Sequence, residues 1–164
     1  MKNKILTGGL WVAIVTLFFA CNHRQEATNT VPTVNKDQIK AEIQSIEDHF
    51  ALIYDHRNAD SITYYADDAV SYFVGQKPIV GKAAIHKFID NELKDYPKGA
   101  KIYNKVVEVD VANDGRFVFE IGAYNQVDST GKILQSGHYF SLFEKRDGKY
   151  VCIRDMANSN PIDN

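Results

Sequence analysis

The chain has 164 residues, of which 45% are hydrophobic, 12% aromatic and 24% charged, and its formal net charge is −2. This length and composition indicate one globular domain of roughly 100–150 residues and exclude an intrinsically disordered chain. The slightly acidic balance also argues against a nucleic-acid partner, because phosphate backbones bind basic surfaces.

The N-terminal segment has the layout of an export signal. Lys2 and Lys4 precede an apolar stretch over residues 5–19, and Ala20 and Cys21 follow it. The stretch is shorter than the roughly 20 apolar residues that a permanent membrane helix needs. We therefore expect cleavage, and the alternatives are an uncleaved anchor or an ordinary secreted protein.

The residues around Cys21 resemble the lipobox of bacterial lipoproteins, in which the cysteine is acylated and becomes the new N-terminus. The usual leucine is replaced here by Phe18, three residues before the cysteine. The resemblance implies a signal peptide over residues 1–21 with a lipidated Cys21. It also implies a protein of the cell envelope, anchored by lipid to a membrane and facing the periplasm or the exterior. The only other cysteine, Cys152, is predicted to be a buried and inert thiol.

Residues 22–36 are polar and show no apolar period, so they are predicted to form a flexible tether ahead of a domain over residues 37–160. The domain begins with a long amphipathic helix that runs to about Asn58, after an N-cap pair of Asn35 and Gln38. Its apolar residues recur at spacings of three and four: Ile39, Ile43, Ile46, Phe50 and Ile53.

Two further helices are predicted. The second is short, begins at residue 60 or 61 and carries Ile62 and Tyr65, and the third covers residues 82–96. Between them lie a short strand that ends near Phe73 and a loop over residues 75–81, where Pro78 and two glycines interrupt any period.

The C-terminal half changes to a period of two. Strands are predicted near residues 102–112, 116–127, 132–145 and 149–157, separated by turns rich in Asn, Asp and Gly. The expected fold is therefore α+β, with three N-terminal helices packed on a curved antiparallel sheet.

Several stretches are similar to the SnoaL-like group of the nuclear transport factor 2-like superfamily, a cone-shaped fold of helices against a bent sheet. The similarity covers about residues 37–160. It is found at residues 58–62 (NADSI), 64–70 (YYADDAV), 79–85 (IVGKAAI), 137–140 (GHYF), 147–150 (DGKY) and 154–155 (RD).

The resemblance implies a fold but no single function, because the superfamily includes isomerases, cyclases, dehydratases, hydrolases and binding proteins. Ketosteroid isomerases of this superfamily use an aspartate base and a tyrosine. The matching positions hold Phe50 in place of the tyrosine and Phe73 in place of the base. Since phenylalanine can neither take nor give a proton, this mechanism is not expected here.

The fold implies a cavity between the sheet and the first helix, and a pocket needs apolar walls with a few polar groups. His138 is the candidate catalytic residue, as a general base, because Gly137 before it leaves space at a cavity mouth. Neither a cofactor nor a metal is expected, since the histidines are scattered. The predicted ligand-binding residues are His49, Phe50, Tyr54, Tyr72, Phe73, Tyr124 and His138.

These features predict a membrane-tethered, extracytoplasmic SnoaL-like domain that binds a small apolar molecule or a protein partner in its cavity. The alternative is an isomerase, dehydratase or hydrolase with His138 as base and Tyr54 or Tyr72 as donor. A homodimer through the sheet is a third hypothesis, because the strand at residues 117–121 is apolar enough to form an exposed patch.

Overall fold

The computed structural model describes residues 34–161. The predicted signal peptide, Cys21 and most of the predicted tether therefore lie outside the described residues. Within residues 34–161, no helix is both long enough and apolar enough to cross a membrane.

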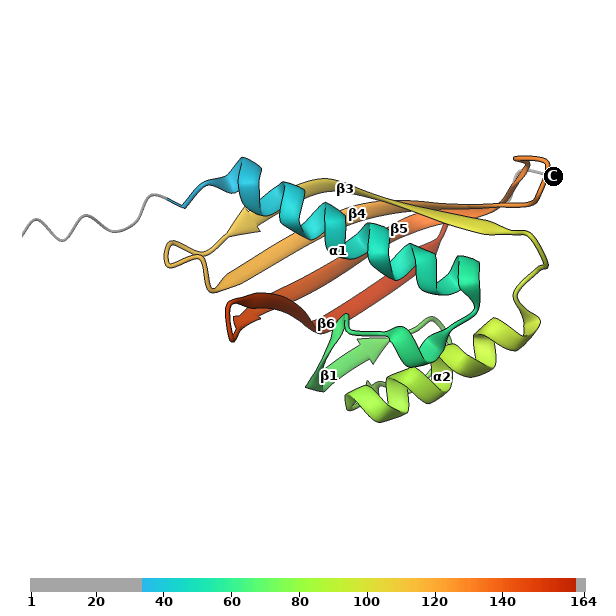
Figure 1. The fold of residues 1–164 in the computed structure, drawn as a ribbon, viewed down its shortest axis with the longest axis horizontal. Coiled ribbons are helices and arrows are strands. Elements are labelled where there is room, and N and C mark those ends of the chain that lie inside the picture. The colour runs from blue at the N-terminus through green and yellow to red at the C-terminus, as the bar shows by residue number, and fades with distance from the viewer. Residues whose placement is uncertain (1–33, 162–164) are drawn as a thin grey trace, which may run out of the picture. The chain divides into compact units, whose positions relative to one another are not determined.

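The described chain forms one mixed sheet of six strands with two α-helices on it (Figure 1). The strand order is β2-β1-β6-β5-β4-β3. The helices are α1 (Lys36–His56) and α2 (Lys82–Asp95), with a 3₁₀ turn η1 (Ala59–Ser61) between them. The strands are β1 (Tyr65–Tyr72), β2 (Ile79–Val80), β3 (Lys101–Val111), β4 (Phe117–Val127), β5 (Ile133–Arg146) and β6 (Lys149–Ser159).

The α+β class and the four long strands agree with the prediction, but the sheet is not purely antiparallel. Strand β1 pairs in parallel with β6, whereas all the other neighbouring strands pair antiparallel. A period of two in the sequence identifies strands, but it contains no information about the direction of a partner that is distant in the chain. The predicted loop at residues 75–81 also contributes the two-residue strand β2.

The second of the three predicted helices is wrong: residues 59–61 form a single 3₁₀ turn, and Tyr65 begins β1. Helix α1 ends at His56 and is capped by Arg57, which has a left-handed backbone (φ 52°) and donates its N–H to the carbonyls of Ile53 and Tyr54. Beyond the turn, β-branched and aromatic residues favour an extended chain, which here enters the sheet.

Helix α1 positions one wall of the domain. Its N-cap is as predicted, because the Asn35 side chain accepts a hydrogen bond of 3.0 Å from the backbone N–H of Gln38. The helix crosses one face of the sheet and packs chiefly along β3, whereas α2 packs against β1, toward the opposite edge of the sheet (Figure 1). The two helices and the sheet thus enclose three sides of a space between them.

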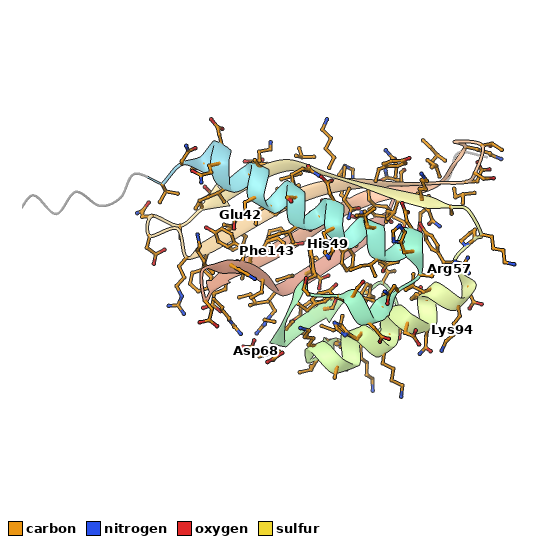
Figure 2. All side chains as sticks on the ribbon, in the orientation of Figure 1. Glu42, His49, Arg57, Asp68, Lys94 and Phe143 are labelled. Atoms are coloured by element: carbon orange, nitrogen blue, oxygen red, sulfur yellow. The ribbon has the colours of Figure 1, made fainter. Side chains whose placement is uncertain are left out.

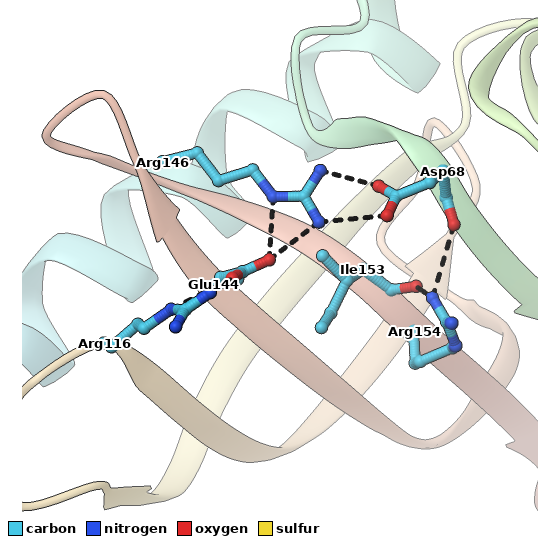
Figure 3. A network of polar contacts seen from close by, with 6 residues as sticks. All are labelled: Asp68, Arg116, Glu144, Arg146, Ile153 and Arg154. Carbon is cyan, nitrogen blue, oxygen red and sulfur yellow. Dashed lines mark hydrogen bonds and ion pairs between the residues drawn. The ribbon is translucent and has the colours of Figure 1, made fainter.

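A network of ion pairs fixes β1 to the end of the β5–β6 hairpin (Figure 3). The Arg146 guanidinium binds Asp68 on β1, with an Nη1–Oδ1 distance of 2.6 Å, and also binds Glu144. Arg116 binds the other oxygen of Glu144, with an Nη2–Oε1 distance of 2.6 Å. Arg154 on β6 is also exposed, and its guanidinium donates to the backbone carbonyl of Asp68.

Candidate functional site

A cavity of about 430 Å³ lies between α1, α2 and the sheet. This size is in the range of small-molecule sites in proteins. Nine aromatic side chains line it: Phe50, Tyr54, Tyr64, Tyr65, Phe73, Phe88, Tyr96, Tyr124 and Tyr139. The rings of Phe50 and Tyr64 have centroids 4.6 Å apart, and those of Phe73 and Phe88 stack at 4.3 Å. The cavity therefore has walls that suit a flat apolar body.

Glu47 places a carboxyl group in this aromatic cavity. It lies on the sheet-facing side of α1 and is 2% exposed. The Tyr64 hydroxyl donates to Glu47 Oε1 at 2.5 Å, and the Asn104 amide donates to Oε2 at 3.0 Å. Burial raises the pKa of Glu47 to about 7, and these two hydrogen bonds limit the rise. Glu47 can therefore exist in both protonation states near neutral pH.

A second buried carboxyl, that of Glu120, lies beside Glu47 on β4 and is completely buried. Among the described residues, no group forms a hydrogen bond of ordinary geometry with either Glu120 oxygen. Burial and the nearby Glu47 carboxyl raise the pKa of Glu120 to about 9. An unpaired charge at this position would be costly, so Glu120 is neutral at pH 7.

A third acid, Asp155 on β6, lies in a row of polar residues that runs across the sheet from Glu120. The cross-strand register pairs Glu120 with Ser141, Ser141 with Asp155, and Asp155 with Ser71. The Tyr65 hydroxyl donates to Asp155 Oδ2 at 2.9 Å, while Oδ1 has no hydrogen-bond partner within the described part of the chain. Burial raises the pKa of this carboxyl as well. Four strands thus contribute one continuous polar row, and two of its members, Ser141 and Asp155, line the cavity.

Two glycines give the tyrosine rings their places on the sheet. Gly122 on β4 pairs with Tyr139 on β5, and a Cβ atom at Gly122 would overlap the Tyr139 ring. In the same way, Gly137 on β5 pairs with Tyr124 on β4, and a Cβ atom at Gly137 would overlap the Tyr124 ring. Tyr139 lines the cavity, and its hydroxyl forms no hydrogen bond of ordinary geometry among residues 34–161. Its pKa is raised well above the ordinary value by burial and by the two glutamates.

The structure brings four of the predicted ligand-binding residues together. Phe50, Tyr54, Phe73 and Tyr124 all line the cavity. Phe50 and Phe73 occupy it as apolar wall residues, and neither has a proton to transfer.

The other three predicted site residues do not line the cavity. His49 lies on α1 with an exposed side chain (Figure 2), and Tyr72 on β1 is also exposed. The expected placement of His138 at the cavity mouth is wrong, because its neighbour Tyr139 turns toward the cavity and successive strand residues face opposite sides. Gly137 leaves space for the ring of Tyr124 instead of exposing His138 to the cavity.

Sequence reasoning missed the acids. Glu47 lies four residues from both Ile43 and Ala51, which are buried on the same face of α1. Glu120 alternates with Val118 and Gly122 in the inward register of β4. Both glutamates stand at positions where the helix or strand pattern calls for an apolar residue. A charged residue at such a position was the signal that could have identified both.

The comparisons with known proteins agree with this architecture. The family model of the nuclear transport factor 2 domain matches residues 44–158. A search of curated proteins gave no match for this chain.

Solved structures share the fold at low sequence identity. A protein of unknown function with a cystatin-like fold from Nostoc punctiforme is 14% identical, with a TM-score of 0.66 over 79% of this chain and 95% of its own. A ketosteroid isomerase-like protein from Erwinia carotovora atroseptica is 16% identical, with a TM-score of 0.60 over 76% of this chain and 99% of its own.

A nuclear transport factor 2-like protein with a cystatin-like fold from Novosphingobium aromaticivorans is 17% identical, with a TM-score of 0.61 over 73% of this chain and 80% of its own. At these identities the structural likeness extends to the fold alone. The family model covers well over half of the sequence, and the chain therefore belongs to the nuclear transport factor 2 domain family.

Proposed function

We propose that this domain binds a small molecule with a flat, largely apolar body, and that Glu47 contacts the polar group of that molecule. The observation that carries the proposal is the aromatic cavity of about 430 Å³ with a buried, oriented carboxyl in its wall. An apolar body would replace water against the rings, while the carboxyl would fix its orientation.

Blocking the cavity tests this proposal. Ala157 lines the cavity, and Ala157→Phe would place a ring inside it. Ala123 faces the other side of the sheet, in register with His138, so Ala123→Phe is a matched control. Isothermal titration of the full chain with 2-phenylethanol would measure binding. We expect wild type and the control to bind and Ala157→Phe to lose binding. Equal binding by both variants would contradict the proposal.

A second candidate function is proton transfer on a bound substrate, as in an isomerase or a dehydratase. The observation that favours it is the Glu47 carboxyl with a pKa of about 7, because an acid–base catalyst works best when its pKa is near the ambient pH. In this form of the hypothesis Glu47 replaces His138 as the base.

Deuterium exchange into 2-tetralone at its α carbon, followed by NMR, would test proton transfer. The catalytic hypothesis predicts exchange above the buffer rate that Glu47→Gln abolishes and His138→Ala retains. Exchange that depends on His138 would restore the original assignment, and exchange at the buffer rate would leave binding as the function.

A third proposal is self-association through the face of the sheet opposite the cavity. Phe119 and Ile121 alternate with buried residues of β4 and are 49% and 44% exposed. Size-exclusion chromatography with light scattering would detect a dimer that Ile121→Lys dissociates. A wild-type monomer at high concentration would contradict it.

We also propose that the domain is tethered to a membrane of the cell envelope through lipid on Cys21. The support is the sequence alone: two lysines, an apolar stretch and a cysteine in lipobox position. Incorporation of a labelled fatty acid into wild type, lost in Cys21→Ser, is the expected result. An unlabelled wild-type protein in the soluble fraction would contradict the tether.

A further inference from the structure

We propose that the ligand of this cavity is an organic ammonium cation with an aromatic or similarly flat body. The inference rests on the proposed binding function and adds the charge of the ligand. Its basis is an asymmetry of the lining. Every charged side chain of the described residues that line the cavity is acidic, namely those of Glu47, Glu92 and Asp155. An anionic ligand would meet no countercharge there.

The aromatic walls suit a cation as well as an apolar body. An ammonium group is attracted to the face of a tyrosine or phenylalanine ring within about 6 Å of its centroid. Phe50 lies one turn after Glu47 on α1, and its ring packs against those of Tyr54, Tyr64 and Tyr65. A cation held by the Glu47 carboxylate would therefore have ring faces beside it.

The hydrogen-bonding groups left free in the cavity are of the kind that an ammonium needs. A primary ammonium has three donors and no acceptor. Asp155 and Tyr139 both line the cavity, and Asp155 Oδ1 and the Tyr139 hydroxyl form no hydrogen bond of ordinary geometry within residues 34–161. An ammonium bound beside Asp155 would add a charged donor to a carboxyl whose only well-formed hydrogen bond comes from Tyr65, and a buried acceptor that lacks a good donor is costly.

A bare metal ion fits this lining poorly. Within residues 34–161, no group of three His, Cys, Asp or Glu side chains is arranged to hold a metal. The nine aromatic side chains of the lining also offer a metal ion no ligands. A molecule that combines one cationic group with an apolar body uses both parts of the lining.

The cation would change the ionisation of the acids around it. The titratable groups that face Glu47 from the packed elements are Tyr64 ahead of β1, Glu120 on β4, Tyr139 on β5, and Asp155 and Cys152 on β6. None of these is cationic, so in the empty cavity burial favours the protonated form of Glu47. Ammonium binding requires the carboxylate and so releases a proton below pH 7. Affinity for an amine must therefore rise with pH up to about 7 and then level off.

The experiment compares three molecules of one shape and different charge: 2-phenylethylamine, 2-phenylethanol and phenylacetate. Isothermal titration of the full chain at pH 6 and pH 8 gives their affinities, and buffers of different ionisation enthalpy give the proton release. We expect the amine to bind at least about tenfold more tightly than the alcohol at pH 8. We also expect proton release with the amine at pH 6 only.

Substitutions separate charge from shape. Glu47→Gln and Asp155→Asn keep the size of each side chain and remove its charge, so each is expected to lose the preference for the amine while binding of the alcohol persists. Glu108→Gln is the matched control, because Glu108 is an exposed glutamate on β3 that does not line the cavity.

Three outcomes overturn the inference. Equal affinity for amine and alcohol shows a neutral ligand site and leaves the proposed binding function intact. Tightest binding of phenylacetate shows that the acids act as protonated donors to an anion. Binding of none of the three contradicts both the inference and the binding function on which it rests.

Discussion

Glu47 shows how the environment of one side chain sets its chemistry. The same carboxyl that would be ionised on the surface is held near half-protonation by burial, because the hydrogen bonds from Tyr64 and Asn104 recover only part of the lost solvation. Each of these donors favours the ionised form.

Tyr64→Phe is therefore expected to raise the pKa of Glu47 above 7. The lost hydrogen bond is to a charged acceptor, so the rise is about one unit. A ¹³C NMR titration of the Glu47 carboxyl would measure it. Phe143 lies beside Tyr64 but donates nothing to Glu47, so Phe143→Leu is a control. A pKa that does not move would show that burial alone sets it.

Glu120 makes a stronger prediction, because within the described residues its carboxyl forms no hydrogen bond of ordinary geometry, and burial together with the Glu47 carboxyl raises its pKa. Its pKa of about 9 in the folded state is above the ordinary value of 4.5. Such a group supports folding below pH 4.5, and this support is lost as the pH rises toward 9. Glu120→Gln removes the titration and keeps the shape.

We expect Glu120→Gln to be more stable than wild type at pH 8, by on the order of 5 kcal/mol, and to lie within about 1 kcal/mol of it at pH 5. Thermal unfolding followed by circular dichroism at the two pH values would measure the difference. The exposed Glu108→Gln is expected to change neither value. A Glu120→Gln that is equally destabilised at both pH values would contradict the ionisation argument.

At the level of elements, β4 and β5 form the floor of the cavity through a pairing of small with large residues. Gly122→Ala would drive a methyl group into the ring of Tyr139. Overpacking of this kind costs about 1–3 kcal/mol. Chemical denaturation would measure the loss, and Ala123→Val on the opposite face is expected to cost less than about 0.5 kcal/mol. A tolerated Gly122→Ala with an unchanged tyrosine signal in near-ultraviolet circular dichroism would contradict this packing.

The elements differ in how well their sequences predicted them. Helix α1 and strands β3 to β6 have strong local periods and are as expected within one or two residues. The 3₁₀ turn η1 and the parallel pairing of β1 with β6 depend on contacts between distant segments, which local periods do not contain.

The site was predicted only in part for a related reason. Four of the aromatic residues that line the cavity were predicted. They have large side chains that the fold must bury, so composition and position pointed to them. Glu47 and Glu120 were missed because charged residues are normally read as solvent-exposed. His138 was misplaced by one step of the strand alternation, which a local sequence cannot fix without the register.

For the molecule as a whole, the buried acids determine how stability depends on pH. Glu47, Glu120 and Asp155 all have raised pKa values, so each adds stability at low pH that is lost as the pH rises. Carboxyls that pair with arginine have lowered pKa values, as Glu144 does beside Arg116 and Arg146, and they lose their contribution only as the pH falls below about 4.5. His86, with a lowered pKa, opposes the acids only below about pH 6.5.

The domain is therefore expected to be most stable near pH 5 and to become less stable toward pH 8. Melting temperatures across this range would test the slope. If an ammonium ligand neutralises the acids, 2-phenylethylamine is expected to raise the melting temperature more at pH 8 than at pH 5. A stability that rises steadily from pH 5 to pH 8 would mean that the buried carboxyls do not titrate as inferred.

The parallel pairing of β1 with β6 has a consequence for the order in which the protein folds. Residues 73–148 lie between these two strands, so their contact closes a long loop, and contacts of high sequence separation form slowly. A growing chain that stops before β6 has Glu47 and Glu120 but lacks Asp155, and it leaves the edge of β5 without a partner. The cavity is thus completed by β6, the last strand of the described residues. A ligand that needs Asp155 cannot speed the earlier steps of folding, and it would extend the lifetime of the native protein by slowing unfolding.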